Sequence, residues 1–93
     1  MTRFDLAIPF ILKDKFKKLG AKWDMHNKLW YCEKDELPKE LEDYVIERVE
    51  LEYDKKDIMK SKITSLFFYK KIKSWCVAKK DLEDFDKYYA EII

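Results

Sequence analysis

The sequence contains little that could form a flexible linker. Its 93 residues include one Gly and two Pro, and no stretch is rich in Gly, Ser or Pro. Linkers between domains are usually rich in these residues, and a chain of this length is typical of a single domain. We therefore expect residues 1–93 to form one compact domain, with a core supplied by the 47% of residues that are hydrophobic.

Cysteine and histidine are also scarce. The two cysteines, Cys32 and Cys76, lie in no CxxC pair and are too few for a disulfide framework, so we expect buried, reduced thiols. The single histidine, His26, falls in a predicted turn, whereas a zinc site needs several converging ligands. Without a nucleophile beside a base or a Gly-rich phosphate loop, the sequence predicts no catalytic residue, no metal and no cofactor.

Long apolar runs are absent as well. No segment approaches the ~18 apolar residues of a membrane span. The first residues lack the basic and apolar regions of a signal peptide. We therefore expect an intracellular, cytoplasmic protein that has no membrane partner.

Neither sign of charge is in excess, because 20 Lys and Arg nearly balance 19 Asp and Glu. The charges are nevertheless segregated along the chain. Residues 13–28 carry a net charge of +4 and residues 33–54 carry −7, after which residues 55–80 carry +8 and residues 81–93 carry −4. A basic block followed by an acidic block thus occurs twice, which indicates an internal duplication.

The apolar pattern repeats in the same two halves, residues 3–44 and 46–89. The first half predicts a strand at residues 4–10, a helix at 12–19, a hairpin at 21–32 and a helix at 37–45. The second half predicts a strand at residues 48–53, a helix at 56–63, a hairpin at 66–77 and a helix at 82–92. We therefore expect an α+β fold of two tandem β-α-β-β-α repeats, related by a pseudo-two-fold axis, with an antiparallel-rich sheet packed against helices.

A few residues mark the boundaries of these elements. Gly20 stands where a left-handed residue would end the first helix, and Pro9 places the end of the first strand at a sheet edge or bulge. Asp81 is expected to cap the last helix. Trp30 and Trp75 align the two repeats, and the connection before the second hairpin is two residues longer than the one before the first.

The first repeat carries a run of residues that resembles a known domain. The run is Ile8-Pro9-Phe10, Lys13-Asp14, Lys17, Leu19-Gly20-Ala21-Lys22-Trp23-Asp24, Lys28 and Trp30-Tyr31. It resembles a small domain of unknown function found in plasmid primases, conjugation proteins and other mobile-element proteins. The same order of residues is similar to the HARP domain of annealing helicases, which engages branched DNA. The resemblance implies a DNA-processing or mobile-element context, and the second repeat is a degenerate copy in which Phe68-Tyr69 replaces Trp23-Asp24.

Lysine-rich segments supply the candidate binding residues. Eighteen Lys against two Arg favour neutralisation of phosphate charge over bidentate recognition of bases. The candidate nucleic-acid site combines lysines of the first helix and both hairpins with an aromatic residue that could stack on unpaired bases. Its residues are Lys13, Lys17, Lys18, Lys22, Lys28, Lys70, Lys71, Lys73 and Tyr69. The alternative for the lysines is a solvated face, and Trp23, Trp30 and Trp75 are expected to be mainly structural.

Two classes of function follow from these observations. The first is a non-enzymatic nucleic-acid-binding accessory protein of a mobile element or virus, which binds single-stranded or branched DNA without sequence preference. The second is a small viral, phage or plasmid interaction protein that binds a host or defence factor through its charged patches and inhibits it. Clustered lysines favour the first class, and the near-zero net charge favours a protein partner.

Overall fold

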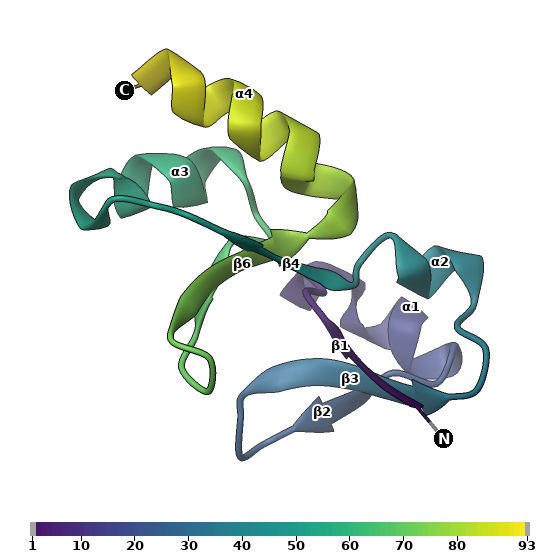
Figure 1. Cartoon of the computed structure of the whole chain (residues 1–93). Helices are drawn as coiled ribbons and strands as arrows, with labels where there is room; N and C mark the ends of the chain where they lie inside the picture. Colours follow the sequence, from purple (N-terminus) through teal and green to yellow (C-terminus); the bar gives the residue numbers. More distant parts are fainter. Residues whose placement is uncertain (1, 93) are drawn as a thin grey trace.

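The computed structural model describes residues 2–92, which fold as two successive units of strands and helices (Figure 1). The first unit contains β1 (Thr2–Leu6), α1 (Lys13–Lys18), β2 (Lys22–Asp24), β3 (Leu29–Lys34) and α2 (Lys39–Glu42). The second unit contains β4 (Ile46–Val49), α3 (Lys56–Lys62), β5 (Phe67–Tyr69), β6 (Ser74–Ala78) and α4 (Leu82–Ile92). Short 3-10 helices precede α1, α3 and α4, at Phe10–Leu12, Tyr53–Lys55 and Lys79–Asp81. The predicted β-α-β-β-α order thus occurs twice.

Each unit contains one antiparallel three-stranded sheet. The strand order is β1-β3-β2 in the first unit and β4-β6-β5 in the second, so the last strand of each hairpin is central. Trp23 faces Trp30 across the first hairpin, and Phe68 faces Trp75 across the second. Trp30 and Trp75 therefore occupy equivalent central strands, and the predicted α+β class is confirmed.

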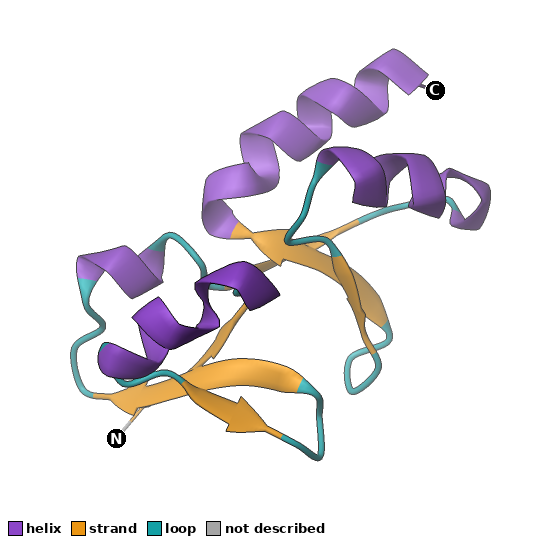
Figure 2. Ribbon diagram, turned by 180° about the vertical axis from the view of Figure 1, so that it is seen from behind, coloured by secondary structure: helices purple, strands orange, loops and turns teal. Residues whose placement is uncertain are grey.

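Each sheet packs its own two helices on one face (Figure 2). In the first unit, Phe16 of α1 and Leu41 of α2 pack in a buried cluster with Trp30 of β3. In the second unit, Met59 of α3 and Phe85 of α4 pack in the same way against β6. Because the two clusters are separate, each unit has an apolar core of its own. Full burial of a Phe, Leu or Met side chain contributes roughly 1.5–3 kcal/mol to the stability of the fold.

The first strand of each unit is shorter than its alternating pattern predicts. β1 ends at Leu6 rather than at residue 10, and β4 ends at Val49 rather than at residue 53. Pro9 has no N–H to donate to a ladder, and the chain turns there into a 3-10 helix. Burial does not continue the alternation past β1 either, because Ala7 and Ile8 are both buried whereas Phe10 is 75% exposed. A period of two therefore did not show where strand pairing stops.

Two predictions about the closing helices need correction. α2 spans four residues instead of residues 37–45, because Val45 leaves the helix and forms a β-bridge with Leu6. Asp81 lies in the 3-10 helix that leads into α4, and its carboxylate accepts a hydrogen bond from the Ser65 hydroxyl at 2.6 Å. In both cases a partner far away in the sequence replaces the local interaction that the helix signal predicts.

Both thiols are buried, as predicted. Cys32 and Cys76 are inaccessible to solvent and form no disulfide. Cys32 belongs to the core of the first unit, whereas Cys76 belongs to a separate cluster. Burial raises the pKa of the Cys76 thiol to about 11, so this thiol stays protonated and weakly nucleophilic at neutral pH.

Gly20 follows the end of α1 in a backbone conformation that residues with a side chain adopt only with strain. Its φ is +104°, which confirms its predicted role after the helix. Beside it, the Lys34 ammonium donates a hydrogen bond to the carbonyl oxygen of Leu19 at 2.9 Å. A Cβ atom at position 20 would lie 2.9 Å from Cε of Lys34.

We expect Gly20→Ala to lower the free energy of unfolding by about 1–2 kcal/mol, because a left-handed backbone costs a residue with a Cβ roughly that much. Urea denaturation followed by circular dichroism measures this loss. Gly20→Asn is the matched variant, since Asn tolerates a positive φ better than Ala does, and its loss should be smaller. Equal losses in the two variants would assign the effect to the Lys34 contact and not to the backbone.

Candidate nucleic-acid interface

The two units meet through the sheet faces that carry no helices. Successive strand residues point to opposite faces, so Trp30 faces the helices whereas Leu29 faces the second unit. Leu29 packs there in a third buried cluster with Tyr69 and Cys76. Tyr69 is only 2% exposed. This burial corrects the prediction that Tyr69 stacks on bases, because its ring is enclosed between the two sheets.

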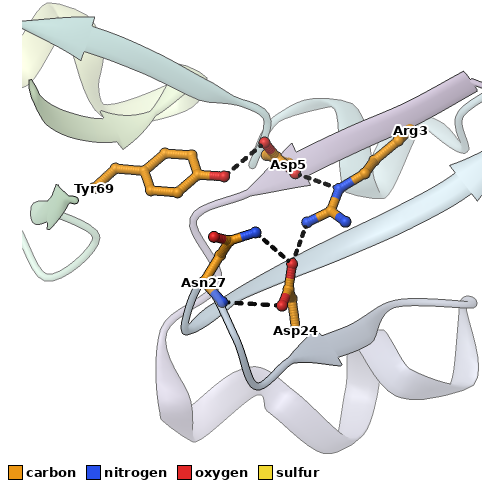
Figure 3. A network of polar contacts seen from close by, with 5 residues as sticks. All are labelled: Arg3, Asp5, Asp24, Asn27 and Tyr69. Carbon is orange, nitrogen blue, oxygen red and sulfur yellow. Dashed lines mark hydrogen bonds and ion pairs between the residues drawn. The ribbon is translucent and has the colours of Figure 1, made fainter. Parts of the chain in front are cut away.

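A chain of polar contacts links this interface to the turn of the first hairpin (Figure 3). The Tyr69 hydroxyl donates to Asp5 at 3.3 Å. Arg3 donates to Asp5 at 2.9 Å and to Asp24 at 2.6 Å. The backbone and side-chain nitrogens of Asn27 donate to the two Asp24 oxygens, at 3.0 and 2.9 Å. These contacts therefore connect β5 of the second unit to the β2–β3 turn of the first.

The same contacts keep Arg3, Asp24 and Tyr69 each in a single protonation state at neutral pH. Hydrogen bonds hold the pKa of Asp24 well below its ordinary value of 3.8. The bond from Arg3 has the largest effect, and the bonds from Asn27 have the next largest. The hydrogen bonds to Asp24 and Asp5 raise the pKa of Arg3. Burial raises the pKa of Tyr69 the most, and the negative charge of Asp5 raises it further. Asp24 is therefore ionised and Tyr69 neutral over the physiological range.

The turns of the two hairpins lie side by side (Figures 1 and 2). Each turn ends on a lysine with a positive φ, 56° at Lys28 and 51° at Lys73, two residues before the Trp of the central strand. Between the turns lies a cleft of about 240 Å³. We name it the hairpin-tip cleft, and its lining residues are His26, Asn27, Lys28, Phe68, Lys70 and Lys71.

The hairpin-tip cleft is cationic. Lys28, Lys70 and Lys71 are exposed, and within residues 2–92 none of the three forms an ion pair. Lys73 is exposed in the same turn as Lys70 and Lys71. Like charges that surround one cleft repel each other, and an anion bound among them removes that repulsion. The structure therefore brings together three predicted lysines that come from different units.

A second cleft, of about 260 Å³, lies between the two units and shares Lys28 with the first. We name it the inter-unit cleft, and the lining residues that concern its chemistry are Phe10, Trp23, Lys28, Trp30, Thr64 and Phe67. Trp23 is 46% exposed and faces Trp30 across the first hairpin, so of the two structural positions expected for it, core or hairpin pair, it occupies the hairpin pair. Trp30 is buried as expected, and Trp75 is half-buried against the core of the second unit.

Two lysines of α1 lie over aromatic rings of the inter-unit cleft. The Lys13 ammonium is 4.0 Å from the ring centroid of Phe10, and the Lys17 ammonium is 5.8 Å from that of Trp30. Trp23 packs edge-on against Trp30, with ring centroids 5.3 Å apart. A cation within about 6 Å of an aromatic ring is attracted to its face. Lys13 and Lys17 are therefore held beside an aromatic surface that is partly open to solvent.

Two of the predicted lysines lie elsewhere. Lys22 alternates with Trp23 along β2 and therefore points to the opposite face of the sheet. Lys18 is exposed on α1 and lines neither cleft. The alternating pattern does not predict Phe10 as a surface residue, because it extends the first strand to residue 10. Pro9 was the available signal, since a proline that ends a strand puts the next residue in a turn.

The described part of the chain shows no arrangement for metal chemistry. Within residues 2–92, no group of three or more His, Cys, Asp or Glu side chains could hold a metal ion. His26 is exposed in the first hairpin turn, as predicted. None of the helices in these residues has the length and apolar character that crossing a membrane requires. What the two clefts offer to a ligand is positive charge beside aromatic rings.

Comparison with known proteins matches one segment of the chain. Residues 3–45 match a family described as a domain of unknown function (DUF5710), and this segment corresponds to the first unit. No curated protein and no solved structure matches the chain. The match supports the resemblance to an uncharacterised domain, but it carries no link to the HARP domain or to mobile elements.

We expect Asp24→Asn to lower stability at neutral pH and to make it less sensitive to acid. The pKa of Asp24 is lower in the folded chain than its ordinary value of 3.8, so its stabilising contribution is complete above that value. The contribution is lost as the pH falls through the folded pKa. Urea denaturation between pH 7 and pH 2.5 should show a constant gap between wild type and variant that narrows below about pH 4.

Asp86→Asn serves as the control for this experiment, because Asp86 is an exposed carboxylate on α4. Its effect on the free energy of unfolding should be smaller than that of Asp24→Asn at pH 7. A gap between wild type and Asp24→Asn that stayed constant down to pH 2.5 would show that the Arg3 contact does not lower the pKa of Asp24.

Proposed function

We propose that this chain is a non-enzymatic accessory protein that binds single-stranded or branched DNA without sequence preference. The observation that carries the proposal is the convergence of both hairpin turns on one cationic cleft. The first turn contributes Lys28 and the second contributes Lys70 and Lys71, next to the partly exposed ring of Phe68. The resemblance of the first repeat to domains of mobile-element proteins supports a role in a mobile element or virus.

The chemistry of the two clefts suits a single strand better than a duplex. Lysine ammonium groups that neutralise phosphates release counterions, and this gain does not depend on base sequence. The rings of Trp23 and Phe68 are 46% and 44% exposed. Stacking of a base on such a ring contributes ~1–3 kcal/mol, and it requires a base whose face is open. Unpaired bases meet that requirement, whereas bases inside a duplex do not.

Exposed apolar side chains support a second candidate function. Phe10, Ile11 and Met25 are 75%, 88% and 80% exposed, and exposed apolar surface is typical of protein interfaces. In this alternative the chain is a small viral, phage or plasmid interaction protein that binds a host or defence factor and inhibits it. The charged blocks of the sequence would then provide complementarity to the partner.

We expect Lys70→Glu combined with Lys71→Glu to weaken binding to labelled single-stranded DNA at least tenfold at about 50 mM salt. Both side chains are exposed at the hairpin-tip cleft, so the fold should not change. Fluorescence anisotropy at several salt concentrations measures the affinity. The slope of log affinity against log salt should become shallower by about 0.7 for each phosphate contact that is lost.

Lys39→Glu combined with Lys87→Glu is the matched control, because these lysines are exposed on α2 and α4 and line neither cleft. The change in net charge is the same, and the affinity should fall much less. Equal losses in the two double variants would show that overall charge, and not the hairpin-tip cleft, controls binding. If no DNA binds even at low salt while a protein partner copurifies in stoichiometric amount, the interaction-protein alternative replaces the proposal.

A further inference from the structure

The two units present aromatic rings and lysines at equivalent positions on their surfaces. Phe10 and Tyr53 each begin the 3-10 helix that precedes the first helix of the unit, and they are 75% and 77% exposed. Lys13 and Lys56 are the first residues of α1 and α3. The Lys13 ammonium lies 4.0 Å from the centroid of Phe10, and the Lys56 ammonium lies 4.8 Å from that of Tyr53.

The hairpins repeat this correspondence. Trp23 packs edge-on against Trp30 with ring centroids 5.3 Å apart and an angle of 64°, and Phe68 packs against Trp75 at 5.4 Å and 69°. The outer ring of each pair is about half exposed, 46% for Trp23 and 44% for Phe68. The geometry of the ring pair and the exposure of its outer ring are therefore similar in the two units, although the outer residue is Trp in the first unit and Phe in the second.

A lysine of the preceding helix lies over the inner ring of each pair. Lys17 of α1 is 5.8 Å from the centroid of Trp30, and Lys60 of α3 is 5.2 Å from that of Trp75. Each helix thus places two lysines, one turn apart, above two aromatic residues. Core packing explains the inner rings, but it does not explain why the outer rings remain open to solvent in both units.

We propose that each unit binds its own segment of single-stranded nucleic acid, an inference that rests on the function proposed above. The first platform consists of Phe10, Lys13, Lys17, Trp23 and Trp30. The second platform consists of Tyr53, Lys56, Lys60, Phe68 and Trp75. In each platform the exposed rings receive unpaired bases and the two lysines neutralise the adjoining phosphates. The complementary charge and the open ring surfaces favour a single strand as the occupant.

The hairpin-tip cleft joins the two platforms. Phe68 of the second platform lines this cleft, and Lys28 lines both this cleft and the inter-unit cleft that contains Trp23. A strand that leaves one platform therefore meets further lysines on its way to the other. The longest dimension of the molecule is 40 Å, and a strand of 15 nucleotides spans roughly 50 Å at ~3.4 Å per nucleotide. Such a strand is long enough to occupy both platforms, and its second contact is then intramolecular.

The three tryptophans allow the platforms to be observed separately. Trp23 and Trp30 belong to the first platform, and Trp75 belongs to the second. We expect the oligonucleotide dT5 to shift all three indole N–H signals in the ¹H–¹⁵N spectrum of the wild-type chain. The same spectrum shows whether each variant is folded.

Two matched double variants separate the platforms, because each removes two lysines. Lys13→Ala with Lys17→Ala should abolish the shifts of the first platform's indoles and leave the shift of the second. Lys56→Ala with Lys60→Ala should have the reverse effect. The longer dT15 should bind wild type with one strand per chain, and either double variant should bind dT15 at least tenfold more weakly because the intramolecular second contact is lost.

The outcomes distinguish this inference from the function on which it rests. If dT5 shifts only one set of indoles, or if one double variant binds dT15 as tightly as wild type does, the chain has a single platform. The function proposed above then survives, provided that dT15 still binds with the expected salt dependence. If neither oligonucleotide binds to the wild-type chain, both the inference and the proposed function are wrong.

Discussion

Tyr69 is enclosed between the helix-free faces of the two sheets, and the relative position of the units depends on this contact. Its ring packs with Leu29 and Cys76, and its hydroxyl donates to Asp5. A displacement would leave the hydroxyl unpaired in a buried site, which costs about 1–3 kcal/mol. Tyr69 is the last residue of β5 and Leu29 is the first residue of β3, so both border a hairpin turn. The contact that fixes the units therefore also places the two turns side by side.

This placement explains how a chain with almost no net charge acquires a cationic surface. The residues that line the two clefts come from positions 6–30 and 64–71. Within the described residues, the acidic blocks at 33–54 and 81–92 contribute no lining residue to either cleft. The alternation of charge along the sequence thus becomes a separation of charge in space. An anion in these clefts meets lysines, while most carboxylates lie on the closing helices and on the segments around β4.

Local signals in the sequence predicted the hairpins, the first helix of each unit and the left-handed residue Gly20, because each depends on neighbours within a few positions. They did not predict the burial of Tyr69, whose hydrogen-bond partner Asp5 is 64 residues away. The same limit applies to Trp23, since only the packing of the units shows that it lines a cleft between them and stays 46% exposed. Of the candidate site, the turn lysines could be predicted from composition. Their convergence could not, because it depends on the contact between the two units.

The second unit differs from the first in the segment between its first helix and its hairpin. Four residues connect α3 to β5, against three between α1 and β2, so the connection is longer by one residue and not by the predicted two; α3 is itself one residue longer than α1. Ser65 holds the longer segment in place by accepting the Ala78 N–H at 3.0 Å and by donating to Asp81 at 2.6 Å. Residues 64–67 then line the inter-unit cleft together with Trp23. Rings and lysines are thus equivalent in the two units, but the longer segment of the second unit also lines the cleft that contains the aromatic surface of the first. A base bound beside Trp23 would therefore have more of its apolar surface removed from water than a base bound on an open ring, and this burial favours binding.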